Sequence, residues 1–154
     1  MKAQPSRDPH SVRRAVAVDG FEGSRNAAES LAARPWPAGT EIRVWSAVDL
    51  GLSALDAAHL ESQRAAAMQR TEDAIDSARR ILEAAGLQTF SSISVFVASP
   101  KEIILQEAAN WPADVIVLGS HGHGGFSGFP LGSTSEAVAT HAACSVAVIR
   151  AKNE

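Results

Sequence analysis

The sequence has one cysteine, no excess of basic residues and no long apolar run, and each shortage excludes a class of protein. Cys144 alone cannot form an internal disulfide, which fits a reducing compartment. A net charge of −3 offers no basic field to a nucleic-acid backbone. No apolar stretch approaches the roughly 20 residues of a membrane helix, and the first residues lack the apolar core of a secretory signal. We therefore expect a soluble cytoplasmic protein without a nucleic-acid or membrane partner.

The 154 residues are enough for one domain, and apolar and polar segments alternate along them. Residues 1–11 are polar, contain two prolines and show no period, so they are predicted to be a flexible tail before a domain over 12–154. Short apolar runs predict strands, and the segments between them predict helices. The predicted strands are 13–19, 40–49, 89–99, 113–120 and 145–151, and the predicted helices are 24–33, 54–85, 100–110 and 133–143.

Regular alternation of strands and helices predicts an α/β fold, a single open five-stranded parallel sheet with helices on both faces, Rossmann-like. The run ADVIVLGS (113–120) is the most apolar, which is typical of a central strand buried on both faces. Gly86 stands where a left-handed residue would end the long helix. Ser24 is predicted to cap the first helix, and Ser133-Thr134-Ser135-Glu136 reads as a capping box for the last one.

The segment GSHGHGGFSGFPLGSTSEA (119–137) contains six glycines and two histidines but no lysine or arginine. A Walker A loop needs a lysine, and here Gly132 is followed directly by Ser133. The dinucleotide pattern needs a sixth-position glycine, where this chain has Ser127, and it belongs after the first strand. A third pattern, G-x-x-G-x(9)-G-[ST], is complete with Gly119, Gly122, Gly132 and Ser133.

Each part of this third pattern has a physical use in holding a nucleotide. Gly119, at the end of a strand, lets a flat ring or a ribose approach the backbone, and Gly122 permits a turn with inward amides. Gly132 and Ser133 open a helix, whose unpaired N–H groups and macrodipole favour a phosphate. The pattern therefore predicts an anion site at the start of the last helix.

With this spacing, and with AVAVDGFEGSRNAAESLA near the beginning, the chain resembles the universal stress protein family, in its nucleotide-binding branch, from Arg14 to Arg150. The resemblance implies the strand order 3-2-1-4-5 and an ATP or AMP site at the carboxyl ends of the strands. It also implies a role for each matching position. Asp19 would meet the ribose or adenine edge, the backbone at Ala47 would read adenine, Ala17 and Leu118 would floor the pocket, and Gly119, Gly122, Gly132, Ser133, Thr134 and Ser135 would surround ribose and phosphates.

Simpler interpretations stand beside several of these roles. Ala17 departs from the proline that many nucleotide-binding members carry there, and Asp19 could be only a turn residue before Gly20. His121 and His123 lack an identifiable third ligand, so no metal site is predicted from them. They could instead supply the missing positive charge near the phosphates, or be exposed loop residues without a partner. The three tryptophans are expected to be packing residues.

No lysine and no clearly placed base accompany the loop, so we predict no catalytic residues and at most slow ATP hydrolysis. Mg²⁺ could accompany the phosphates. The alternative is a nucleotide-free interaction or chaperone-like stress protein that uses the domain for dimerisation. An adenylyl-transfer enzyme is a third option, but no second catalytic signature is present. The apolar edge strand 145–151 invites pairing, and the resemblance implies a homodimer through it.

Overall fold

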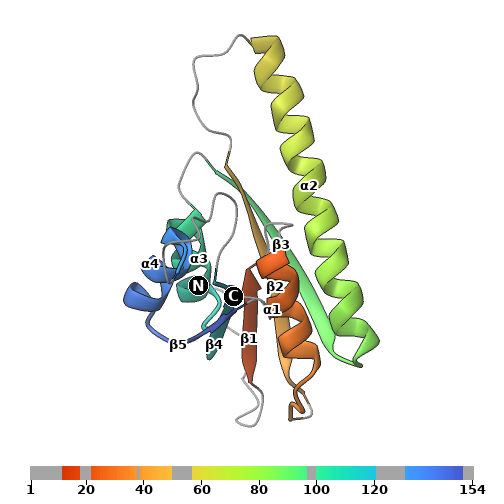
Figure 1. Ribbon diagram of the computed structural model, residues 1–154, viewed down its shortest axis with the longest axis vertical. Helices are drawn as coiled ribbons and strands as arrows, with labels where there is room; N and C mark the ends of the chain where they lie inside the picture. Colours follow the sequence, from red (N-terminus) through yellow and green to blue (C-terminus); the bar gives the residue numbers. More distant parts are fainter. Residues whose placement is uncertain are drawn as a thin grey trace, which may run out of the picture.

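The structure, a computed structural model, describes residues 12–17, 22–37, 39–49, 57–96, 100–120 and 131–150. All described strands form one parallel five-stranded sheet in the order β3-β2-β1-β4-β5, as predicted (Figure 1). The predicted tail, residues 1–11, lies outside the described residues. The elements are β1 (Arg13–Ala17), α1 (Glu22–Ala32), β2 (Glu41–Asp49), α2 (Ala57–Ala84), β3 (Gln88–Phe96), α3 (Pro100–Asn110), β4 (Val115–Gly119), α4 (Ser133–His141) and β5 (Ser145–Ile149).

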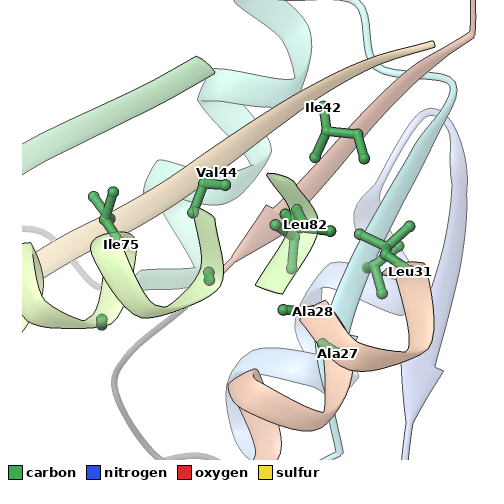
Figure 2. Packing of buried hydrophobic residues seen from close by; sticks show 11 residues of the cluster. Ala27, Ala28, Leu31, Ile42, Val44, Ile75 and Leu82 are labelled. Carbon is green, nitrogen blue, oxygen red and sulfur yellow. The ribbon is translucent and has the colours of Figure 1, made fainter. Parts of the chain in front are cut away.

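The helices cover the two faces of the sheet in pairs, because neighbouring residues of a strand point to opposite faces. On one face, α1 and α2 pack over β1, β2 and β4 (Figure 2). On the other face, α3 and α4 pack over the same three strands. Ile116 and Val117 on β4 belong to different clusters and are 0% and 4% exposed, so the predicted burial of this strand on both faces is confirmed.

Two helix starts differ from the sequence prediction. α1 begins at Glu22, so Ser24 lies inside the helix, where it is buried, and does not precede it. α4 begins at Ser133, and the extended residue before it, Gly132, is the N-cap. The capping-box prediction is therefore wrong by one residue, which moves Glu136 out of the position that could reach back to the cap. Gly86 has φ +81°, which confirms the left-handed end of α2.

The tryptophans lie in packed surroundings, as expected. The Trp36 indole donates a 2.8 Å hydrogen bond to the carbonyl oxygen of Leu31, and the Arg14 guanidinium lies 4.4 Å from the centre of its ring. Trp45 and Trp111 meet edge to face, with 6.2 Å between ring centres. These rings, together with the stems of the arginines, extend both core clusters.

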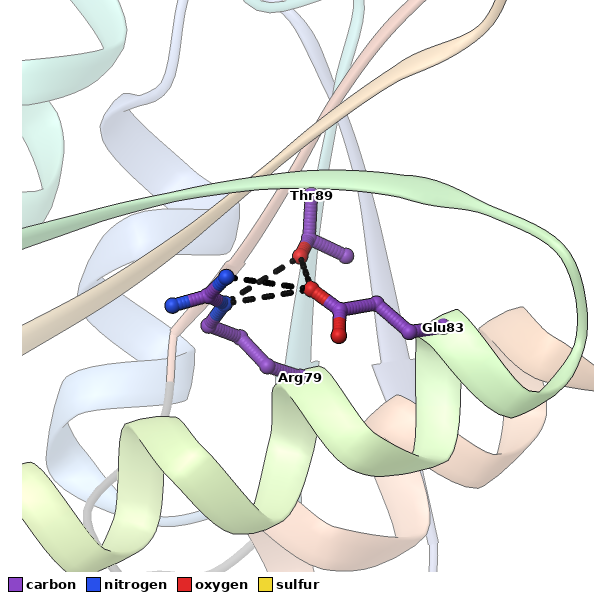
Figure 3. A network of polar contacts seen from close by, with 3 residues as sticks. All are labelled: Arg79, Glu83 and Thr89. Atoms are coloured by element: carbon purple, nitrogen blue, oxygen red, sulfur yellow. Dashed lines mark hydrogen bonds and ion pairs between the residues drawn. The ribbon is translucent and has the colours of Figure 1, made fainter.

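The end of α2 is tied to the edge strand β3 by a polar network (Figure 3). The Thr89 hydroxyl donates to Glu83 Oε1 at 2.7 Å, and Arg79 Nη2 donates to the same oxygen at 3.1 Å. The hydrogen bonds from Thr89 and Arg79 lower the pKa of Glu83 below its usual value. The network therefore favours the ionised carboxylate.

Replacing Thr89 by valine keeps the shape of the side chain but removes one donor to Glu83. Because the lowered pKa of Glu83 makes its ionised form stabilising, the contribution is present above the unfolded pKa and lost as pH falls through the folded pKa. We expect T89V to have a lower free energy of unfolding than the wild type at pH 7. This difference between the two proteins should disappear on acidification below pH 4. Urea unfolding across this range measures it. A pH-independent gap, or the same gap in an E83Q background, would contradict the assignment.

Candidate functional site

The carboxyl ends of β4 and β5 hold the start of α4 in place through backbone hydrogen bonds. The amide of Ser120 donates to the carbonyl of Ile149 at 2.8 Å, and the amide of Gly132 donates to the carbonyl of Ser120 at 2.7 Å. Ser120 is 1% exposed, so this connection lies within the protein. The first turn of α4 is thereby fixed beside the carboxyl end of β4.

The hydroxyl groups of the first turn of α4 have different surroundings. Ser135 is buried, and its hydroxyl donates a 2.6 Å hydrogen bond to the carbonyl of Gly119. Ser133 is exposed and Thr134 is half-buried. No side chain of the described chain caps the helix at Gly132, so the first amides of α4 lack that acceptor. These amides and the helix dipole together favour an anion at this corner.

Gly119 faces a closer neighbour than the sequence suggested. A Cβ atom built there would overlap the carbonyl group of Gly23 and would lie 2.8 Å from its Cα. The absence of a side chain therefore lets the first turn of α1 reach the end of β4. A role for the Gly119 backbone toward a ligand stays a prediction, but the steric need for glycine comes from α1.

The predicted floor residues lie in one row across the sheet. Ala17 on β1 pairs with Trp45 on β2, and Leu118 on β4 pairs with Val148 on β5. Since Val16 pairs with Val117, the next step along both strands brings Ala17 beside Leu118. Both belong to the face covered by α3 and α4, and position 47 is the next one above Trp45 on that face.

The structure thus brings together the backbone and small residues predicted at positions 17, 118, 119 and 132 to 135. Asp19, Gly122 and His123, with His121, lie outside the described residues. Trp45, which was expected to be a packing residue and does lie in the core, is also a neighbour of the predicted floor. Its place beside Ala17 in the register is the signal that only the sheet reveals.

Neither metal ligation nor thiol chemistry has support among the residues that the structure describes. These residues contain no group of three or more histidine, cysteine, aspartate or glutamate side chains placed to hold a metal ion. Burial raises the pKa of Cys144 above its usual value, which keeps its thiol protonated. No helix in the described ranges has both the length and the apolar character required to cross a bilayer.

The fold defines a class: an open parallel α/β domain whose strand order reverses between β1 and β4, the place where domains of this architecture generally bind their ligands. The model of the universal stress protein family matches residues 13–150. The chain therefore belongs to the universal stress protein family. Universal stress protein A homolog 2 of Coxiella burnetii is 47% identical over 58 residues, which are 38% of this chain and 39% of that protein.

Solved structures of similar fold cover most of this chain. The universal stress protein UspA from Lactobacillus plantarum has a TM-score of 0.76 at 24% identity, covering 93% of this chain and 100% of its own. A family protein from Arabidopsis thaliana with AMP bound has a TM-score of 0.67 at 18% identity, with 90% and 91% covered. The Archaeoglobus fulgidus universal stress protein in complex with dAMP has a TM-score of 0.67 at 19% identity, with 90% and 97% covered.

Substituting Gly119 tests its contact with Gly23. We expect G119A to lower the free energy of unfolding by about 1–3 kcal/mol through overpacking, and G119V to lower it further. Gly86 is the control, since it has φ +81° and open space around its Cβ position. There the cost of alanine arises from the backbone, so asparagine, which tolerates the left-handed region, should recover part of it. Denaturant unfolding measures the stability of G119A, G119V, G86A and G86N. A G119A variant as stable as the wild type would contradict the contact between Gly119 and Gly23.

Proposed function

We propose that the protein binds ATP or AMP, with the phosphates at the first turn of α4 and the base above β1, β2 and β4. The observation that carries this is the uncapped start of α4, fixed at the reversal point by Ser120 and Ser135. The AMP and dAMP complexes of proteins with the same fold support an adenine nucleotide as the ligand class. In this proposal, nucleotide binding serves a regulatory or stress-response role.

The proposed contacts follow the geometry of the described residues and the sequence motif. Gly132, Ser133, Thr134 and Ser135 surround the phosphates, while the backbone at Gly119 and Gly122 lies beside the ribose. Ala17 and Leu118 form the floor under the base, the backbone at Ala47 reads its edge, and Asp19 meets the ribose or the base. Ser135 contributes mainly through its amide, because its hydroxyl already donates to Gly119.

Binding is expected to exceed catalysis. The sequence from residue 102 to residue 149 contains no lysine or arginine that could stabilise a transferring phosphoryl group. Backbone amides, with Mg²⁺ on the phosphates, can hold ATP without such a residue, but they supply no base for the attacking water. The proposed activity is therefore at most slow ATP hydrolysis.

Replacing Ser133 by aspartate separates binding from folding. A carboxylate in the first turn interacts favourably with the dipole of α4, so S133D should keep wild-type stability, yet its charge repels the phosphates. We expect ATP affinity to fall at least about tenfold, as measured by titration calorimetry. Ala139, an exposed residue in the second half of α4, provides the control A139D with the same added charge. Equal ATP affinity of S133D and A139D would exclude the phosphate site.

His123, or His121, is proposed to support the phosphates as an imidazolium. With an ordinary histidine pKa of about 6.5, the positive charge is present at pH 6 and mostly lost at pH 8. ATP affinity should therefore be higher at pH 6, and H123Q together with H121Q should abolish the difference. His141, in the last turn of α4, provides the control H141Q, which should retain it. Equal affinity of the wild type at both pH values excludes the role.

The second proposal concerns assembly through β5. This strand is at the edge of the sheet, and its residues Val146 to Ile149 are only half-buried by α1, α4 and β4. An apolar edge with unpaired backbone groups favours antiparallel pairing with a second copy. The same module without nucleotide would be a dimeric interaction protein, and mass spectrometry of the purified protein for bound nucleotide separates these two functions.

Static light scattering tests the dimer directly. At micromolar concentration we expect twice the mass of the 154-residue chain, with or without added ATP. A monomer across the micromolar range would contradict pairing through β5.

A further inference from the structure

The indole of Trp45 carries a hydrogen-bond donor for which the described part of the chain offers no acceptor. The residue is 2% exposed, and its Nε1 atom is buried without a hydrogen-bond partner among the described residues. Trp36 shows the usual arrangement, since its Nε1 donates to the carbonyl of Leu31. Leaving a buried donor unpaired opposes folding, so such groups are rare and need an explanation.

The neighbours of Trp45 explain why no acceptor is present. It belongs to the cluster under α3 and α4, whose other members are aliphatic or aromatic side chains such as Ile104, Leu118 and Val138. Trp111 contacts it edge to face, and an aromatic face is at best a weak acceptor. A better acceptor must therefore come from outside this set of residues.

The position of Trp45 connects this donor to the proposed base pocket. It is the direct partner of Ala17 in the register of β1 and β2, and position 47 follows on the same face. Ala17, the floor residue that pairs with Trp45, is only partly buried and carries a small side chain. A flat ring resting on the row formed by Ala17 and Leu118 would lie next to the indole edge.

We propose that Trp45 is a specificity-determining residue of the base pocket, and that its indole N–H donates to a ring nitrogen of the bound adenine. Purine ring nitrogens accept hydrogen bonds in the plane of the base, which suits a donor at the side of a flat pocket. This inference rests on the proposed nucleotide binding and adds the residue that recognises the base. Binding then supplies the acceptor that is missing among the residues that the structure describes.

The first experiment compares ATP binding by the wild type, W45F and W36F in titration calorimetry. W45F keeps a ring but removes the donor, so ATP affinity should fall about threefold to tenfold, the effect of one buried hydrogen bond. Thermal unfolding without nucleotide should not show a matching loss, because W45F removes an unpaired group. W36F, which breaks the bond to Leu31, should lower the melting temperature and leave ATP affinity unchanged. Wild-type affinity of W45F overturns the proposal.

The second experiment removes the acceptor and uses the wild-type protein, so it also decides the matter if W45F does not fold. ATP is compared with its 1-deaza, 3-deaza and 7-deaza analogues, each lacking one ring nitrogen. For the wild type, one analogue should bind about threefold to tenfold more weakly than ATP. For W45F, that analogue and ATP should bind with equal affinity. Three analogues that bind like ATP overturn the proposal while nucleotide binding stands. A wild type that binds no ATP at millimolar concentration overturns nucleotide binding itself, and this inference with it.

Discussion

The contact between the backbones of Gly119 and Gly23 is the constraint on which the rest of the molecule depends. It lets α1 lie against the end of β4, and the Gly119 carbonyl also accepts the hydroxyl of Ser135 from α4. One strand end thus locates the starts of two helices that cover opposite faces of the sheet. Because the amides at a helix start are the groups that can hold an anion, the packing of the helices and the geometry of the proposed phosphate site are set by the same few atoms.

Much of the fold was predictable because buried parallel strands are apolar and the helices between them are periodic. Alternation alone indicated an α/β sheet; the strand order required the family resemblance, since periodicity carries no information about which strands pair. The start of α4 was missed by one residue: Ser133 and Gly132 are both good caps, and only the extended backbone of Gly132, with φ −68° and ψ 158°, identifies it as the N-cap. Likewise, the sequence marks Gly119 as special without saying which atoms approach it.

The amino ends and the carboxyl ends of the strands are surrounded by residues of different size and charge. Near the amino ends, Arg14 and Arg43 stack on Trp36 and Trp111, and burial lowers the pKa of both guanidinium groups. Large rings and long stems fill the space there. Near the carboxyl ends, Ala17 is the small residue on the face covered by α3 and α4, and Gly119, which has no side chain, faces the first turn of α1. Trp45 connects the two regions, because it pairs with Ala17 in the register of the sheet and its ring meets Trp111 edge to face.

The long helix α2 has one further consequence. Its 28 residues extend for about 42 Å, and its first half reaches beyond the sheet (Figure 1), with buried positions beginning only at Thr71. A free peptide as short as that half would be mostly unfolded in water, so its helicity is propagated from the anchored turns around Ile75 and Leu82. Amide protons should therefore exchange progressively from the amino-terminal end of α2 toward the sheet, and that end can melt and re-form without disturbing the core.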